Sequence, residues 1–136
     1  MPGEGFEEHV SLHGIHVFLV VEDADSRELI QTVLEYAGAL VSSAGAPRTA
    51  LATLHAIRPD VLLADLGADG EAAVTLLEQV HTLRDGARIP AIVVSTRGGR
   101  DERQRLLKAG FHEHLVKPID PWELCRLVAS LAERGA

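Results

Sequence analysis

Five polar residues stand directly after short apolar runs, and their types suit phosphoryl chemistry: Glu22, Asp23, Asp65, Ser95 and Lys117. Three carboxylates brought close together repel one another and raise each other's pKa unless a cation lies among them. A hard divalent cation with oxygen ligands relieves that repulsion, and Mg²⁺ that keeps several waters fits such a site. A lysine and a hydroxyl nearby would supply positive charge and a donor to the oxygens of a phosphoryl group. The pattern therefore predicts Mg²⁺-dependent phosphoryl chemistry.

The elements that must bring these residues together are short β-branched or aliphatic runs that alternate with helix-like segments. The runs are His16–Val21, Leu40–Ser43, Val61–Asp65, Ile89–Ser95 and His114–Val116. This alternation predicts an α/β fold, a flavodoxin-like (βα)5 doubly wound parallel sheet with strand order 2-1-3-4-5. Ligands of such sheets bind at the carboxyl ends of the strands, beside the point where the strand order reverses. The five polar residues fall at these ends.

The helix-like segments show apolar residues at helical spacing. The first ends before Gly38, which suits a left-handed cap, and its apolar stripe is Leu29, Ile30, Val33, Leu34 and Ala37. The second extends through Ile57 and stops before Pro59. The last begins at Asp120-Pro121, where an aspartate can cap and a proline suits the first helical position.

Length and composition predict one globular domain. The chain has 136 residues, of which 46% are hydrophobic and 24% are charged, and this excludes a disordered or fibrous chain. Residues 1–14 carry Gly, Glu and His with little apolar periodicity, so we interpret them as a tail or linker. Residues 15–136 are then the single domain.

Charge and hydropathy exclude several kinds of partner. The chain has 13 Lys and Arg against 20 Asp and Glu, and the resulting formal charge of −7 would repel a nucleic-acid backbone. No apolar run approaches the roughly 20 residues of a membrane helix, and the first residues do not follow the order of a signal peptide. The one cysteine, Cys125, cannot form an intrachain disulfide. We therefore expect a cytoplasmic protein with no membrane insertion and no direct contact to nucleic acid.

The residues at the strand ends resemble those of the receiver domain of two-component response regulators. The resemblance covers residues 15–133 and is carried by four motifs. These are Val-Val-Glu-Asp at 20–23, Pro-Asp-Val-Leu-Leu-Ala-Asp at 59–65, Val-Val-Ser at 93–95 and Val-Lys-Pro at 116–118. Together they are far more specific than any one alone.

The resemblance implies a role for each polar residue. Asp65 corresponds to the phosphoacceptor, and Lys117 to the lysine that contacts the phosphate. Glu22 and Asp23 correspond to the acidic pair that binds Mg²⁺ together with Asp65. Ser95 corresponds to the switch hydroxyl, which turns toward the phosphoryl group after transfer.

The resemblance also implies partners. A sensor histidine kinase or a histidine phosphotransfer protein would donate the phosphoryl group from a phosphohistidine. The domain would be no enzyme beyond its self-phosphorylation and self-dephosphorylation. The fourth helix, which holds Leu106 and Leu107 and ends at Gly110, would form a face together with the strand His114–Val116 and the last helix. This face would bind a downstream protein target or a second copy as a homodimer. The sequence leaves open whether the chain is a stand-alone regulator or a receiver from a longer hybrid kinase.

The residues implied in switching depart from the usual family pattern. His114 stands where the family usually has Tyr or Phe, so switching is expected to be weaker or pH-dependent. Thr96 and Arg97 follow the switch hydroxyl, and Pro118 follows the lysine. Gly98-Gly99 gives unusual backbone freedom to the connection between the fourth strand and the fourth helix, and we predict mobility in this connection.

The loop after the phosphoacceptor departs as well. Ala68-Asp69 stands where the family usually has Met-Pro. Gly67 and Arg97 occupy the positions that tune dephosphorylation in the family. Gly67 has no side chain to orient an attacking water, so we predict slow self-dephosphorylation. Only its backbone carbonyl can serve, as a metal ligand.

Several alternatives remain. A degenerate receiver-like interaction module that is not phosphorylated is favoured by Ala68-Asp69 and His114. A haloacid-type phosphohydrolase is suggested by the segment 23–26, but the later acidic pair of that family is missing and Asp65 would have no role. A flavodoxin is disfavoured because the acids after the first strand would repel its phosphate. His112 and His114 share one side of a short strand, but two histidines without a third ligand rarely hold a transition metal.

Overall fold

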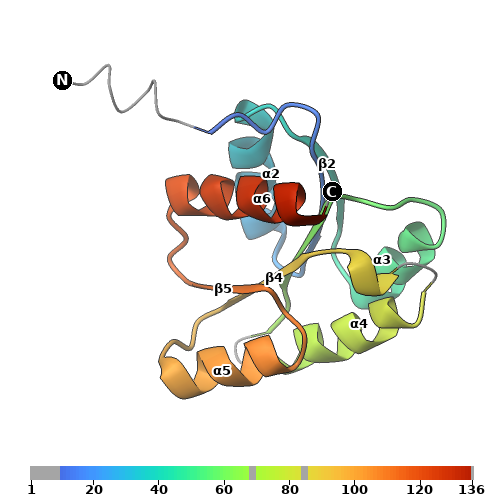
Figure 1. The fold of residues 1–136 in the computed structure, drawn as a ribbon, viewed down its shortest axis with the longest axis vertical. Coiled ribbons are helices and arrows are strands. Elements are labelled where there is room, and N and C mark those ends of the chain that lie inside the picture. The colour runs from blue at the N-terminus through green and yellow to red at the C-terminus, as the bar shows by residue number, and fades with distance from the viewer. Residues whose placement is uncertain (1–9, 68–69, 84–85, 136) are drawn as a thin grey trace.

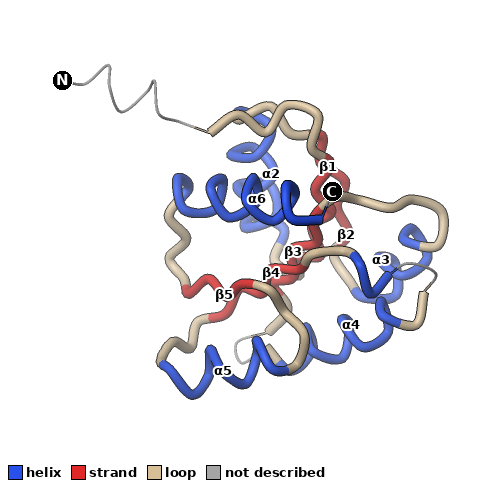
Figure 2. Tube along the Cα trace, viewed as in Figure 1, coloured by secondary structure: helices blue, strands red, loops and turns tan. Residues whose placement is uncertain are grey.

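The computed structural model describes residues 10–67, 70–83 and 86–135, and within them the strands form one parallel sheet. The strands are β1 (His16–Val21), β2 (Leu40–Ala44), β3 (Val61–Asp65), β4 (Ala91–Ser95) and β5 (Glu113–Val116). They lie in the order β2-β1-β3-β4-β5, and every neighbouring pair is parallel. The predicted α/β fold and strand order are therefore confirmed. Figure 2 shows the strands as a central layer between helices.

Helices cover both faces of this sheet. In the described residues they are α2 (Ala24–Tyr36), α3 (Pro47–Leu54), α4 (Glu71–His81), α5 (Arg100–Lys108) and α6 (Pro121–Gly135), with a short 3-10 helix η1 (Gly86–Arg88) before β4. α2 and α6 lie on one face, and α3, α4 and α5 lie on the other (Figure 1). Each of the helices α2 to α5 lies between two consecutive parallel strands, as doubly wound folds require, and α6 follows the last strand.

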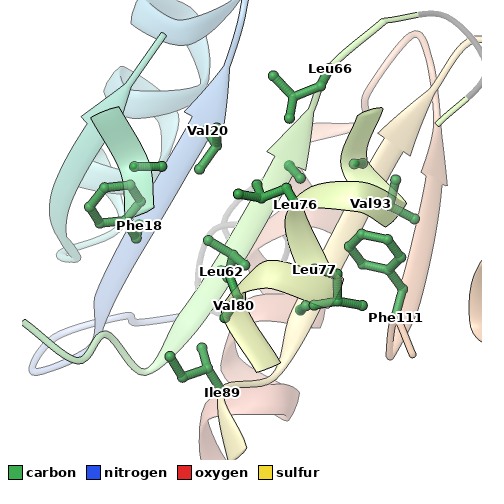
Figure 3. Packing of buried hydrophobic residues seen from close by; sticks show 14 of the residues in the cluster. Phe18, Val20, Leu62, Leu66, Leu76, Leu77, Val80, Ile89, Val93 and Phe111 are labelled. Atoms are coloured by element: carbon green, nitrogen blue, oxygen red, sulfur yellow. The ribbon is translucent and has the colours of Figure 1, made fainter. Parts of the chain in front are cut away.

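Two apolar clusters, one on each face, hold the layers together. Successive side chains of a strand point to opposite faces, so Val20 and Val93 pack with the first cluster while Leu19 and Ile92 pack with the second. Figure 3 shows the first cluster, in which Leu76 and Leu77 of α4 face the sheet. Because the central strands are buried on both faces, they appear in the sequence as continuous apolar runs.

Two predictions about helix positions were wrong in detail. Leu29 was expected in the buried stripe of the first helix, but its exposed fraction is 65%, because Ile30 and Leu34 alone of the described α2 residues turn fully toward the sheet. The second helix was expected to extend through Ile57 but ends at Leu54. Ile57 is half-buried in the turn that follows, where its amide still donates to the carbonyl of Thr53 at 3.1 Å.

The fourth strand begins later than predicted. It starts at Ala91 instead of Ile89, because the amide of Ile89 donates to Gly86 of η1 at 3.2 Å. Pro90 has no amide hydrogen to give to a neighbouring strand. Its carbonyl nevertheless accepts from the amide of Leu62 at 2.9 Å, so the chain is already aligned with the sheet there.

Packing also extends N-terminally of residue 15. Leu12 lies within the segment interpreted as a tail or linker, yet it is fully buried in the cluster beneath α2 and α6. Its amide donates to the carbonyl of Ala37 at 2.7 Å, near the end of α2. The turn at Gly38, whose φ is 106°, brings this region beside the start of β2. Residues 1–9 of the predicted tail lie outside the described residues.

Candidate functional site

The sheet register brings the strand ends to one edge. Val21 of β1 lies opposite Asp65 of β3, and the amide of Glu22 donates to the carbonyl of Asp65 at 3.1 Å. Ser95 of β4 lies opposite Val116 of β5, and the amide following Val116 donates to the carbonyl of Ser95 at 2.9 Å. These backbone bonds continue the ladders one residue beyond each strand. We call this edge, formed by the ends of β1, β3, β4 and β5, the carboxyl edge.

Asp65 and Lys117 form an ion pair across the carboxyl edge. The Nζ atom of Lys117 lies 2.9 Å from Oδ2 of Asp65, whose side chain is only 5% exposed. Among the described residues Oδ2 receives no well-directed hydrogen bond, so the lysine neutralises its charge without satisfying its lone pairs. A buried carboxylate in this condition favours a second cation or a donor from a ligand.

Asp23 lies at the same edge as the N-cap of α2. Its Oδ2 accepts a hydrogen bond from the amide of Ser26 at 2.8 Å. That bond is the main reason why the pKa of Asp23 lies below its ordinary value, and the positive charges of Lys117 and Arg27 lower it further. The carboxylate is exposed and therefore charged at neutral pH. The charge of Lys117, which pairs with Asp65, therefore also acts on the carboxylate of Asp23.

Arg27 was not predicted as part of this region. Its guanidinium donates to the carbonyl of Val21 at 2.8 Å, so it ties α2 to the last residue of β1. Its amide also donates to the carbonyl of Asp23 at 2.9 Å. The spacing of four residues between Asp23 and Arg27 on a helix was the available signal. Arg27 thus helps to fix the position of the acidic turn.

The chemistry of these oxygens fits a hydrated divalent cation, although the carboxylates are not gathered tightly. Among the described residues, no three His, Cys, Asp or Glu side chains form a group that could hold a metal alone. Glu22 is exposed, and only its backbone joins Asp65 directly. Mg²⁺ usually keeps several waters and needs only one or two protein carboxylates. The incompletely satisfied Oδ2 of Asp65 and the charged Asp23 meet that requirement.

Gly67 leads out of the site in a left-handed conformation. Its φ is 74°, its position is exposed, and no atom lies within 4 Å of the place where a Cβ would stand. The departure predicted at Ala68-Asp69 lies outside the described residues.

Ser95 and His114 form a buried hydrogen-bonded pair. Ser95 is fully buried and His114 is 8% exposed. The Oγ atom of Ser95 lies 2.7 Å from Nε2 of His114 and donates to the carbonyl of Arg97 at 3.0 Å. Burial lowers the pKa of His114, the charges of Arg103 and Arg105 lower it further, and Glu102 opposes them. The ring is therefore neutral at neutral pH.

The other residues predicted near the switch lie around this pair. Thr96 and Arg97 are exposed at the start of the connection to α5. Gly99 has a φ of 105°, which a residue with a side chain rarely adopts. Pro118 is exposed and follows a cis peptide bond. The structure thus brings Ser95 together with His114 and the backbone of Arg97.

The two histidines considered as a metal pair have other partners. Nδ1 of His112 accepts a hydrogen bond from the amide of Ala91 at 3.0 Å, whereas His114 contacts Ser95 at the opposite end of β4. Each ring therefore contacts a different part of the neighbouring strand.

A pocket of about 510 Å³ opens beside the ion pair, between α2 and the start of α6. Most of its lining is apolar, and it includes Leu29, Ile30, Val33, Ile119 and Leu124 together with Asp65 and Lys117. The exposed side chain of Leu29 forms part of the wall of this pocket. Within the described ranges, every helix is too short or too polar to cross a bilayer.

Comparisons with known proteins agree on one family. The family model of the response regulator receiver domain matches residues 17–129. The chain is 34% identical over 118 residues to the "Uncharacterized 14.6 kDa protein in sodA1 3'region" of Leptolyngbya boryana, covering 87% of this chain and 90% of that protein. It is 29% identical over 123 residues to the phosphate regulon transcriptional regulatory protein PhoB of Pseudomonas aeruginosa, covering 90% of this chain and 54% of PhoB.

A third relative is the sensor histidine kinase GacS of Pseudomonas protegens, 28% identical over 125 residues, covering 90% of this chain and 14% of GacS. The chain therefore spans nearly all of the first relative, about half of the second and a small part of the third.

Solved structures show the same fold. The receiver domain of sensor histidine kinase PA1611 from Pseudomonas aeruginosa PAO1, with a magnesium ion coordinated in its active site cleft, superposes with a TM-score of 0.78. Sequence identity is 22%, and the match covers 88% of this chain and 98% of that one. The receiver domain of the Francisella response regulator 1452 gives a TM-score of 0.81 at 23% identity, covering 90% and 100%.

Proposed function

The chain belongs to the response regulator receiver domain family, and from this premise we propose that Asp65 accepts a phosphoryl group in a Mg²⁺-dependent reaction. The observation that carries the proposal is the buried carboxylate of Asp65, paired with Lys117 at 2.9 Å and not fully satisfied by hydrogen bonds from the described residues. The unsatisfied oxygen of this carboxylate can bind a cation, and the neighbouring ammonium of Lys117 can bind an incoming anionic group.

The donor is proposed to be a phosphohistidine of a sensor histidine kinase or a histidine phosphotransfer protein. A carboxylate oxygen of Asp65 attacks the phosphorus, and a P–O bond forms as the P–N bond breaks. The electron pair of the broken bond goes to the imidazole nitrogen, which takes a proton from water. The product on Asp65 is a mixed anhydride of aspartate and phosphate.

The residues of this chain divide the work of that step. The ammonium group of Lys117 already lies beside the Asp65 carboxylate. During transfer it would stabilise the negative charge that develops on the phosphoryl oxygens. Asp23, Asp65 and the carbonyl of Gly67 would hold the metal, with Glu22 acting through water. Bound Mg²⁺ would neutralise part of the charge on the phosphoryl oxygens. The hydroxyl of Ser95 would donate a hydrogen bond to one of these oxygens.

The output is proposed to be a change of surface instead of a catalysed reaction on another substrate. The face formed by α5, β5 and α6 would bind a downstream protein target or a second copy of the chain. The network around Ser95 and His114 lies directly beneath the beginning of that face. We place this activity in the cytoplasm, where histidine kinases expose their phosphorylated domains.

Intact mass measured after incubation with acetyl phosphate and Mg²⁺ tests the proposal. Wild type is expected to gain the mass of one phosphoryl group, and the gain is expected to vanish on chelation of Mg²⁺ or in Asp65→Asn. Asp101→Asn, in the exposed first turn of α5, is the matched control and should be phosphorylated like wild type. No gain in wild type, with either acetyl phosphate or a phosphorylated phosphotransfer protein, would instead support an interaction module without phosphorylation.

A further inference from the structure

Ser95 has one hydroxyl hydrogen but two close partners. Its Oγ lies 3.0 Å from the carbonyl oxygen of Arg97, which can only accept, and 2.7 Å from Nε2 of His114. If the hydroxyl hydrogen goes to Arg97, Nε2 of His114 must supply the hydrogen of the second bond. The neutral ring then carries its proton on Nε2 and leaves Nδ1 as an acceptor.

We propose that His114 is a positioning residue that donates from Nε2 to Ser95 and confines the serine hydroxyl to two acceptors, the Arg97 carbonyl and a phosphoryl oxygen on Asp65. This inference rests on the proposed function of Asp65 for its second acceptor only. The bond from His114 occupies one lone pair of Oγ in both states. The serine hydrogen alone changes partner.

Burial makes this arrangement restrictive. Ser95 is fully buried and His114 nearly so, which means that water cannot easily replace either partner. A hydrogen bond in such surroundings polarises the next one, so donation from His114 strengthens donation by Ser95. A phenylalanine at position 114 would provide no such donor.

The exchange of acceptor links the site to the connection between β4 and α5. While Ser95 donates to Arg97, the backbone of residues 95–97 is held in a closed turn. When the hydrogen turns to a phosphoryl oxygen, the Arg97 carbonyl loses its partner and must find water. Gly98 and Gly99 follow immediately, and Gly99 already has a φ of 105°. The turn can therefore rearrange without steric cost from side chains at these two positions.

The charged groups around the imidazole come mainly from α5. Glu102, Arg103 and Arg105 all influence His114, and Arg103 also pairs with Glu113 of β5 at 3.6 Å. A rearranged turn at residues 96–99 would move the start of α5 and hence these charges. His114 thus connects Ser95, which would contact the phosphoryl group at the carboxyl edge, with the charged side chains of α5.

The tautomer of His114 in the unphosphorylated protein provides the direct test. Long-range ¹H–¹⁵N NMR of the full chain is expected to show a neutral ring protonated on Nε2, with the signal assigned through His114→Gln. Addition of Mg²⁺ and beryllofluoride, a stand-in for the phosphoryl group, should keep this tautomer. A ring protonated on Nδ1, or a charged ring at neutral pH, would overturn the inference even if Asp65 is phosphorylated normally.

Variants separate hydrogen bonding from packing. His114→Phe keeps a ring without a donor, and amide hydrogen exchange at residues 96–99 is expected to be about fivefold faster, as for loss of one hydrogen bond. His114→Gln restores a donor amide and should return exchange to within about twofold of wild type. His112→Gln is the matched control, since its ring contacts Ala91 instead of Ser95. Equal exchange in the Phe and Gln variants would contradict a donor role.

Discussion

The two halves of the carboxyl edge differ in how they hold their polar groups. At the ends of β1 and β3, Glu22 and Asp23 are exposed, and only Asp65 is buried. At the ends of β4 and β5, Ser95 and His114 are both buried and bonded to each other. The acidic half therefore presents charge to solvent and to an ion, whereas the hydroxyl half keeps its polar groups within the protein.

This difference assigns ion binding and phosphoryl transfer to one half of the edge and the change of conformation to the other. Exposed carboxylates such as Glu22 and Asp23 can exchange water for a metal ion with little change in packing, because they already face solvent. Buried hydrogen-bonded groups cannot exchange partners without moving the backbone that carries those partners. The acidic half thus suits reversible binding, and the hydroxyl half suits a change of conformation.

Lys117 joins the two halves, and removing it should have the largest effect after loss of Asp65 itself. Lys117→Met keeps a long apolar stem but removes the ammonium that lies 2.9 Å from Asp65. The rate of phosphorylation by acetyl phosphate is expected to fall by about 100-fold or more, as when one charged donor to a transition state is lost. Mass spectrometry over a time course measures this rate.

The chain supplies a good control for this experiment, because Lys108 is its only other lysine. Lys108 is exposed in the last turn of α5, far along the chain from the acids. Lys108→Met removes the same net charge and should leave the rate unchanged. If both variants slowed the reaction equally, the ion pair with Asp65 would not be part of the mechanism.

Within the acidic half, Asp23→Asn should weaken Mg²⁺ binding by about tenfold, through loss of one nearby charge. Asparagine caps helices as well as aspartate does, so the start of α2 is preserved. Asp25→Asn, in the exposed first turn of the same helix, controls for net charge. Calorimetric titration with Mg²⁺ measures both affinities. Equal weakening in the two variants would show that only general electrostatics matters.

The same division explains how far the sequence could predict the molecule. The acidic half depends on strand ends, and strand ends follow from continuous apolar runs, so the positions of Glu22, Asp23 and Asp65 could be predicted from the pattern alone. The order of the strands followed from the alternation of runs and helices together with known rules of parallel sheets. The limits of β1 and β3 were predicted to the residue.

The hydroxyl half could not be predicted in the same way. His114 was singled out because it stands where the family usually has Tyr or Phe, but its bond to Ser95 depends on the register of β4 against β5 and on both side-chain rotamers. The role of the Arg97 carbonyl had no signal in the sequence, because any residue provides a carbonyl. Leu29 was misplaced for a related reason, since helical spacing defines a stripe but not its rotation relative to the sheet.

A smaller effect is expected where the chain leaves the acidic half. Gly67 offers no side chain to orient water, so Gly67→Asn should hasten loss of the phosphoryl group, by about threefold or more. Asparagine tolerates the left-handed φ of 74°, and the space around a Cβ is open. The decay of phosphorylated protein after removal of acetyl phosphate gives the rate, with Gly67→Ala as control for the backbone. Wild-type decay within seconds would contradict slow self-dephosphorylation.

The smallest expected effect concerns stability, and it belongs to the hydroxyl half alone. Burial lowers the pKa of His114 below its ordinary value of 6.5, so the unfolded chain binds a proton there more readily than the folded chain. The free energy of unfolding should therefore fall as the pH is lowered from about 7.5 to about 5.5. The lowered pKa of Asp23 acts only below its ordinary value of 3.8, outside this range. Denaturant titrations at both pH values should show a smaller fall in His114→Gln than in wild type, while His55→Gln, at an exposed position, should follow wild type. A fall of the same size in all three proteins would mean that the buried ring does not resist protonation, and the contrast between the two halves of the edge would then rest on hydrogen bonding alone.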